Sequence, residues 1–136
     1  INMSYEIKLR VPFHDLDPLQ MVWHGNYLKY FDIARFGLFK QAGVDLYQFS
    51  VRQQIIFPVT RFSVKHIVPL RFDDEFICKA TVIEAVYKIA IDFEIRLSEN
   101  GRVCARGKSE QLSVKLPEME MQFEIPGEIT RALEFT

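Results

Sequence analysis

The chain has 136 residues, about the length of one domain, with 17 Lys and Arg against 18 Asp and Glu and a net charge of −1. Such an even balance makes no electrostatic case for binding to nucleic acid or to an anionic membrane. Apolar residues make up 49% of the chain, which excludes wholesale disorder and collagen-like repeats. We therefore expect a single domain over residues 1–136.

The chain carries two cysteines, Cys78 and Cys104, and has neither a CxxC pair nor a Cys/His cluster with zinc spacing. Both lie in apolar, strand-like runs, so we expect reduced, buried thiols; a disulfide between them stays open but has no support. The N-terminus lacks the basic and apolar regions of a signal peptide, and no stretch approaches the ~18 apolar residues of a membrane span. These features favour a soluble cytoplasmic protein that needs no metal or cofactor.

The first half of the chain predicts a strand followed by a long helix. Residues 5–13 alternate apolar and mostly charged side chains, as a half-buried strand does. Residues 14–26 are dense in polar and turn-forming side chains, so we expect an ordered connection with at most a short helical turn. Residues 27–42 contain no proline and are apolar around most of the helix circumference, which is typical of a buried helix. Gly43 is expected to end this helix as a left-handed cap.

A second, short helix and a series of strands are predicted in the remainder. Asp45 with Gln48 resembles a capping box that opens a helix running to about residue 53. Asn100 and Gly101 form a strong hairpin turn. The tail, 118–136, is expected to add a short strand and a final helical turn. Four longer strands are predicted, at 59–68, 75–86, 89–98 and 102–116.

The order of these elements predicts the architecture. Hairpin connections make the last four strands antiparallel. A strand of twelve residues spans ~40 Å and a helix of seventeen residues ~25 Å, so long twisted strands can curl around one apolar helix. We expect an α+β fold in which a curved antiparallel sheet of about five strands wraps a long central helix. Because a single sheet leaves its other face uncovered, we also expect an oligomer.

Polar side chains gather at the entrance to the long helix, where Asp15, Asp17, His24 and Asn26 lie close in sequence. The unpaired N–H groups and partial positive charge of a helix N-terminus can bind an oxygen on which negative charge develops. A carboxylate opposite such donors can act as a base or a nucleophile at a polarised carbonyl. The same residues also fit simple capping of turns and of the helix, so the local chemistry alone leaves both interpretations open.

A spaced motif runs between positions 15 and 35. It reads Asp15-x-Asp17-Pro18, Val22, His24-x-Asn26-Tyr27 and Tyr30-Phe31-Asp32-x-Ala34-Arg35. This spacing resembles the signature of the 4-hydroxybenzoyl-CoA thioesterase family, whose members are hot-dog-fold acyl-CoA thioesterases, and the expected element order over 5–116 is similar to theirs as well. The resemblance implies hydrolysis of acyl-CoA by a homodimer or homotetramer, in which two sheets join edge to edge and active sites form between subunits.

The resemblance also implies a role for each matched residue. Asp17 corresponds to the catalytic carboxylate, acting either as nucleophile or as general base for water. The backbone N–H at His24 would polarise the thioester carbonyl. The His24 side chain either caps the helix, which we favour, or contacts the substrate. Asn26 would hold the loop in place through side-chain hydrogen bonds. Gly25 and Tyr27, within the same motif, are expected to contact the substrate.

Other motif positions are expected to be structural, with one departure from the family pattern. Asp15 should anchor the turn, and Asp32 with Arg35 should form an ion pair on one helix face. The family usually has glycine two residues before the position of Val22, where this chain has Gln20. Glycine allows a close backbone approach or a positive φ. Gln20 therefore leaves three alternatives open: a narrower site, a different acyl group, or weak activity.

Outside the motif the sequence gives fewer functional hints. His66 lies on the apolar face of its predicted strand, so we expect a hydrogen-bonded histidine in the core or an interface. Tyr30, Phe36 and Phe39 are expected to lie mostly in the core. Five basic residues are candidates for binding the phosphates of coenzyme A: Arg61, Lys65, Arg71, Arg106 and Lys108.

Two rival functions remain at this point. An acyl-carrier-protein thioesterase would need a docking surface for an acidic partner, which a nearly neutral chain does not reveal. A non-catalytic acyl-CoA-binding protein would keep the fold and lose turnover, as Gln20 would permit. Release of free thiol from acyl-CoAs separates binding from hydrolysis. The identity of the acyl group lies beyond the sequence.

Overall fold

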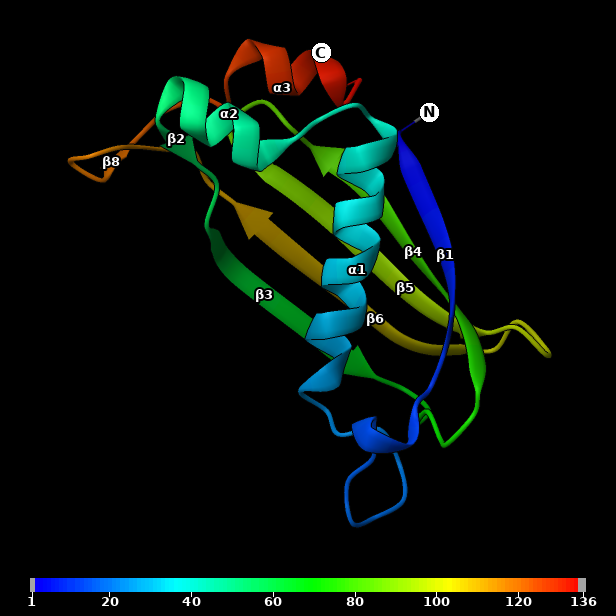
Figure 1. Ribbon diagram of the computed structural model, residues 1–136. Coiled ribbons are helices and arrows are strands. Elements are labelled where there is room, and N and C mark those ends of the chain that lie inside the picture. The colour runs from blue at the N-terminus through cyan, green and yellow to red at the C-terminus, as the bar shows by residue number, and fades with distance from the viewer. Residues whose placement is uncertain (1, 135–136) are drawn as a thin grey trace.

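In the computed structural model, which describes residues 2–134, an antiparallel sheet curves around one long helix (Figure 1). The helix is α1 (Asn26–Gln41), close to the predicted 27–42. This arrangement confirms the expected α+β architecture of five strands around a central helix. The strands lie across the sheet in the order β1 (Ser4–Arg10), β4 (Glu75–Glu84), β5 (Ile89–Leu97), β6 (Val103–Gln111) and β3 (Val59–His66).

The position of β3 in the sheet differs from the prediction of successive hairpins. β3 pairs with β6, with Phe62 opposite Ser109, and not with β4, which follows it in sequence. The connection over residues 67–74 instead crosses to the far side of the sheet. It is held there because Leu70 is fully buried and its carbonyl oxygen accepts a hydrogen bond from the N–H of Val22.

The predicted strand 102–116 is also interrupted. β6 ends at Gln111, and the chain then leaves the large sheet to form a second sheet in the order β2–β7–β8. β2 was not predicted, because two residues are too few to show an alternating pattern. The short strand and the final helical turn predicted in the tail are confirmed. The bounds of these elements are β2 (Ile55–Ile56), β7 (Val114–Lys115), β8 (Glu120–Met121) and α3 (Gly127–Ala132).

The core lies between the inner face of α1 and the concave face of the sheet. Phe31 is fully buried and stacks on Phe93, with ring centroids 4.7 Å apart. Gly107 makes room for this ring, since a Cβ at that position would lie 2.5 Å from an atom of Phe31. Each large side chain buried in this way contributes about 1.5–3 kcal/mol to folding. These contacts fix α1, and therefore its N-terminus, against the sheet.

Two apolar residues predicted to be inside lie outside. Phe36 is 66% exposed on the outer stripe of α1, so the helix is not buried around its whole circumference. Phe13 is 71% exposed, because β1 ends at Arg10 and residues 13–15 form a turn of 3-10 helix instead of continuing the strand. The count of apolar residues overestimated the burial of α1, because a single sheet covers only one side of this helix.

The end of α1 and the start of α2 (Leu46–Gln53) match the sequence patterns. Gly43 follows α1 with φ of +75°, the left-handed conformation expected of a C-terminal cap. The Asp45 side chain accepts a hydrogen bond from the N–H of Gln48 at 3.0 Å and so caps α2. Cys78 and Cys104 are both buried free thiols, as expected, and burial raises the pKa of Cys78 to about 12.

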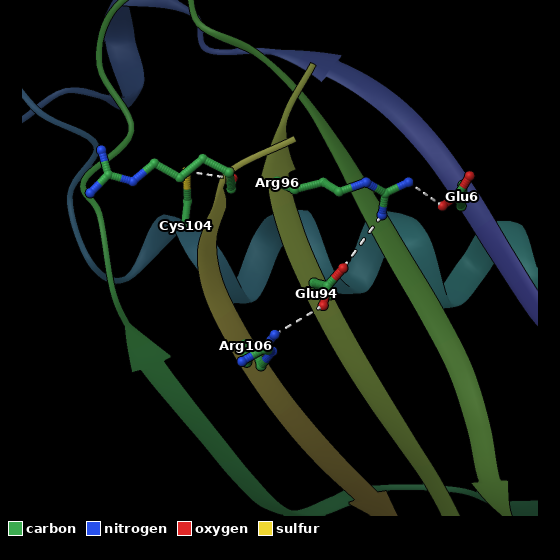
Figure 2. A network of polar contacts seen from close by, with 6 residues as sticks. Glu6, Glu94, Arg96, Cys104 and Arg106 are labelled. Atoms are coloured by element: carbon green, nitrogen blue, oxygen red, sulfur yellow. Dashed lines mark hydrogen bonds and ion pairs between the residues drawn. The ribbon is translucent and has the colours of Figure 1, made fainter. Parts of the chain in front are cut away.

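The outer face of the sheet carries a chain of alternating charges, shown in Figure 2. Arg96 contacts Glu6 at 2.6 Å and Glu94 at 3.5 Å, and Glu94 also contacts Arg106 at 3.5 Å. In Figure 2 α1 lies behind the sheet, so this network faces away from the helix. Partly exposed ion pairs of this kind each contribute about 0–1 kcal/mol. The network therefore marks a hydrated outer surface, separate from the apolar inner face.

Candidate active site

The loop before α1 folds back on itself as a tight turn. Leu16 and Val22 face each other in an antiparallel bridge. Inside this bridge, the N–H of Asp17 donates to the carbonyl oxygen of Met21 at 2.9 Å, and the N–H of Gln20 donates to the carbonyl oxygen of Asp17 at 3.0 Å. The turn therefore fixes the backbone of Asp17 on both sides of its side chain.

Gln20 takes the backbone conformation that explains the glycine usual in the family at this position. Its φ is 64°, in the left-handed region that glycine adopts most easily. The positive φ lets residues 17–20 turn and rejoin the bridge. Gln20 in place of glycine therefore adds backbone strain to the turn, while the backbone keeps the conformation that glycine would adopt.

The Asp17 side chain is half-buried at this turn. Its Oδ1 accepts a hydrogen bond from the N–H of Leu19 at 2.8 Å. Among the described residues, no group donates a hydrogen bond to its second carboxylate oxygen. One oxygen therefore orients the side chain, and the other remains available for chemistry.

Asp15 ties the loop to the helix, as expected of an anchoring residue. Its buried carboxylate accepts hydrogen bonds from the Nζ of Lys29 at 2.6 and 2.7 Å and from the hydroxyl of Tyr30 at 2.7 Å. Burial alone would raise the pKa of Asp15, but the hydrogen bonds from Lys29 and Tyr30, together with the positive charge of Lys29, outweigh burial and hold it below its ordinary value. Its carbonyl oxygen accepts from the N–H of Trp23 at 3.0 Å and from the Nδ2 of Asn26 at 2.9 Å.

The start of α1 corrects the expectation that the His24 side chain caps the helix. The capping residue is Gly25, and no side chain makes a capping hydrogen bond. The turn is closed by the backbone, since the N–H of Asn26 donates to the carbonyl oxygen of Trp23 at 2.9 Å. Within residues 2–134, the backbone N–H groups of His24 and Gly25 have no hydrogen-bond partner. These two donors are therefore available at the positive end of the helix.

Trp23 lies across the start of the helix in a way that the sequence did not reveal. A Cβ at position 25 would lie 2.1 Å from its indole ring, so only glycine leaves room for the ring there. The rings of Trp23 and His24 are 5.1 Å apart, and Trp23 remains 50% exposed. The available N–H groups thus lie beside an exposed aromatic surface.

Tyr27 and His66 connect the helix start to the end of β3. Tyr27 is only 2% exposed, and its hydroxyl accepts a hydrogen bond from the N–H of Leu70 at 3.3 Å. This burial makes Tyr27 a support beneath the site, and direct substrate contact remains a prediction. His66 is exposed, not in the core, because β3 lies at the sheet edge; its ring lies 4.6 Å from that of Tyr27. Partial burial, and then the nearby His24, lower the pKa of His66.

The expected ion pair of Asp32 and Arg35 is present, with an N–O distance of 2.7 Å. Arg35 is 5% exposed, and its guanidinium lies 5.8 Å from the ring centroid of Phe93. Burial lowers the pKa of Arg35, and Asp32 opposes this effect. The pair therefore belongs to the packing of α1 on the sheet.

Four of the five basic candidates for phosphate binding lie together on neighbouring strands β3 and β6, and the fifth lies apart. Lys65, Arg106 and Lys108 line a shallow hollow of about 550 Å³ on the outer face of the sheet. Arg61 lies on β3, the edge strand that also carries Lys65. Arg71 lies beside the candidate site, where its backbone forms a bridge with Met21. In the part of the chain that the structure describes, no three His, Cys, Asp or Glu side chains are placed to hold a metal ion. Over the same residues, none of the helices is long and apolar enough to span a membrane.

Comparison with known sequences identifies relatives of the chain. Residues 11–133 match the family model of the thioesterase-like superfamily. The acyl-CoA thioesterase YbgC of Haemophilus influenzae is 25% identical over 120 residues, which cover 88% of each chain. A putative esterase of Synechocystis, sll0410, is 27% identical over 106 residues, or 76% of this chain. That match spans only 63% of the Synechocystis protein, less than two thirds of its length.

Comparison with solved structures confirms the hot-dog fold. The 1,4-dihydroxy-2-naphthoyl-CoA thioesterase Slr0204 of Synechocystis matches with a TM-score of 0.88 and 18% identity, covering 96% of this chain and 95% of that one. The 4-hydroxybenzoyl-CoA thioesterase of Pseudomonas sp. strain CBS-3 matches with a TM-score of 0.84 and 18% identity, covering 96% and 99%. At this level of identity, the agreement concerns the path of the chain.

Proposed function

The chain belongs to the thioesterase-like superfamily, and we propose that it hydrolyses acyl-CoA thioesters to a free acid and coenzyme A, with Asp17 as the reacting carboxylate. One observation carries this proposal. The turn fixes Asp17 with one carboxylate oxygen available, and the helix start that follows presents two N–H groups that have no partner among the described residues. A relative over most of both chains is named an acyl-CoA thioesterase.

The N–H groups of His24 and Gly25 would receive the thioester carbonyl oxygen. Negative charge develops on this oxygen when the carbonyl carbon is attacked, and the partial positive charge of the helix end stabilises it. One such donor typically contributes about 10²–10³-fold to the rate. Asp15 and Asn26 support this step indirectly, because they hold the loop that presents the donors.

Asp17 would act on the carbonyl carbon by one of two routes. As a nucleophile, its oxygen forms a mixed anhydride while the C–S bond breaks and the thiolate of coenzyme A leaves; water then hydrolyses the anhydride. As a general base, it takes a proton from water, which attacks directly, and coenzyme A leaves as its C–S bond breaks. Rapid quenching separates the routes, because only the nucleophilic route releases coenzyme A in a burst ahead of the acid.

The test is release of free thiol from a panel of aliphatic and aromatic acyl-CoAs. We expect turnover of at least one member well above the rate without protein. Tight binding of every acyl-CoA without thiol release would contradict the proposal and identify a non-catalytic binding protein. A strong preference for the same acyl group on acyl-carrier protein would instead assign that carrier as the substrate.

A further inference from the structure

One histidine outside the motif, His66, is the last residue of β3, and this end of the strand lies beside the start of α1 (Figure 1). By alternation along the strand it shares a face with Phe62, whose ring lies 5.8 Å from that of Phe31 on α1. The His66 ring accordingly turns toward the helix and lies 4.6 Å from that of Tyr27. The strand therefore carries an imidazole to the first turn of the helix that begins at the candidate active site.

The backbone on both sides of His66 is fixed by β6. His66 itself pairs with Ala105 in the antiparallel ladder. Directly after it, the N–H groups of Ile67 and Val68 both donate to the carbonyl oxygen of Cys104, at 2.8 and 3.0 Å. A side chain carried by a fixed strand keeps its position more precisely than one carried by a loop. The sheet therefore sets the place of the His66 ring.

The imidazole of His66 is not engaged in holding the fold together. It touches Tyr27, but the hydroxyl of Tyr27 already accepts a hydrogen bond from the N–H of Leu70. Within residues 2–134, neither ring nitrogen of His66 forms a hydrogen bond or an ion pair, and the side chain is exposed. An imidazole in this condition can exchange a proton with a water molecule or with a bound substrate.

The groups around His66 favour its neutral form. The titratable side chains packed near it are His24 before α1, Tyr27 on α1 and Cys104 on β6. Burial raises the pKa values of Tyr27 and Cys104, so both are uncharged at pH 7. The basic side chains next to it on β3 and β6 line the hollow on the outer face of the sheet. Partial burial, and then His24, lower the pKa of His66, so at pH 7 its ring is a base and not an acid.

The nucleophilic route for Asp17 requires a base that Asp17 itself does not supply. Once the carboxylate has bonded to the acyl carbon, it is part of the mixed anhydride and no longer takes a proton from water. Hydrolysis of the anhydride is accelerated by a group that accepts a proton from the attacking water. Such a base has to lie near the N–H groups of His24 and Gly25, which would hold the oxygen of the acyl carbonyl.

Other acid–base groups at the helix start are less suited to this task. The Asp15 carboxylate is buried and accepts hydrogen bonds from Lys29 and Tyr30. His24 lies on the loop before α1, outside the sheet that fixes His66. His66 combines an available imidazole with a place fixed by the sheet, and is therefore the stronger candidate.

We propose that His66 is the base that takes a proton from the water which hydrolyses the acyl group on Asp17. The inference rests on the function proposed above and selects its nucleophilic route. The water oxygen bonds to the acyl carbon while the bond from that carbon to the Asp17 oxygen breaks, and the electron pair returns to the carboxylate. The His66 ring nitrogen receives the proton and returns it, through solvent, to the thiolate released in the first step. Acyl-CoA and water thus become the free acid and coenzyme A.

The first test compares His66→Gln with the parent on the acyl-CoA that the parent hydrolyses fastest. We expect kcat to fall about 10²-fold, the scale of a lost acid–base group. Because C–S cleavage precedes the step that needs His66, kcat/KM should stay within a few-fold of the parent value while KM falls with kcat. Rapid quenching should show a burst of coenzyme A, about one per site, followed by slow release of acid. A histidine that only supported the fold or bound substrate would lower kcat/KM instead.

The three histidines of the chain form a matched set for a pH profile. In the parent, kcat should fall as the pH drops through the pKa of His66, because only the neutral imidazole takes a proton. This limb should be absent from the remaining activity of His66→Gln and unchanged in His14→Gln, whose side chain is exposed before the active-site turn. His24→Gln should move the limb to higher pH, since the pKa of His66 then rises toward its ordinary value.

Chemical rescue separates the imidazole from the shape of the side chain. His66→Ala leaves an exposed gap beside Tyr27, so imidazole added to the solution should restore part of the lost kcat. The gain should follow the neutral fraction of the added imidazole as the pH is varied. Asp17→Asn, which lacks the nucleophile, should show no comparable gain.

Several results would overturn the proposal. They are a kcat for His66→Gln within a few-fold of the parent, equal losses in kcat and kcat/KM, a release of acid and coenzyme A together without a burst, and no gain from imidazole. A pH limb that disappears in His24→Gln and persists in His66→Gln would assign the base to His24. Failure of the proposed function has a different signature, because the parent itself would then release no thiol from any acyl-CoA and the inference would fall with it.

Discussion

Gln20 carries the backbone strain of the active-site turn. A side chain in the left-handed region costs about 1–2 kcal/mol relative to ordinary conformations, and glycine avoids this cost. The bridge of Leu16 with Val22 and the hydrogen bond from the Gln20 N–H hold the residue there. The strain therefore lies in the same turn as Asp17, whose carbonyl oxygen accepts the hydrogen bond from the Gln20 N–H.

Replacing Gln20 by glycine should relieve this strain. We expect Gln20→Gly to raise the free energy of unfolding by about 0.5–1 kcal/mol, the gain being limited by the greater chain entropy of glycine. Urea unfolding measures the change. Gln20→Val, with a branched side chain at positive φ, should lower stability instead. Equal stability of the two variants would show that the turn is not strained at this residue.

Asp15 should link stability to pH. Its pKa lies below the ordinary value in the folded protein, so its ionised form contributes stability above about pH 4, and this contribution is lost as pH falls further. Because Lys29 is partly exposed, we expect Asp15→Asn to cost about 2 kcal/mol at neutral pH. Urea unfolding at neutral pH and near pH 3 measures both effects. A cost that stays the same at the two pH values would contradict this role.

At the scale of elements, the geometry at the start of α1 predicts that a backbone N–H, and not the His24 side chain, stabilises the charge that develops on the thioester oxygen. His24→Ala keeps the N–H and should retain most of the activity, whereas His24→Pro removes that donor and should lose about 10²-fold or more. Thiol release by the two variants, with circular dichroism as the control for folding, makes the comparison. An equal loss in both variants would assign the chemistry to the imidazole.

The elements that could be predicted from the sequence are those whose pattern is local. Strands β1 and β5 alternate clearly, and Asp45 with Gln48 marked the start of α2. The pairing of β3 with β6 was missed because it depends on contacts far apart in sequence. β2 was missed because its two residues are too few to show an alternating pattern.

The candidate site shows the same limit. Asp17, His24 and Asn26 came from a spaced motif, and the structure adds which of their groups are engaged and which are available. The burial of Arg35 depends on its packing against Phe93 of β5, and the exposure of His66 depends on the place of β3 at the sheet edge. Neither contact can be read from a local sequence pattern. The ring of Trp23 over Gly25 was equally inaccessible from the sequence.

At the scale of the whole molecule, the exposed edge of β3 and the outer stripe of α1 predict self-association. Sedimentation should give a mass of at least twice 16.0 kDa. A fully active monomer at assay concentration would contradict both the expected oligomer and a site completed by a partner copy. An activity that falls on dilution, in parallel with the measured mass, would agree with both expectations.

The most direct measurement of the central claim is the turnover of Asp17→Asn beside that of Asp15→Asn. Asparagine can keep the hydrogen bond from the N–H of Leu19, so the turn should fold and acyl-CoA should still bind. We expect single-turnover thiol release by Asp17→Asn to fall by ~10² or more, while Asp15→Asn mainly loses stability. Hydrolysis by Asp17→Asn within a few-fold of the parent rate would contradict the account and move the search to His24 or to a carboxylate of the partner subunit.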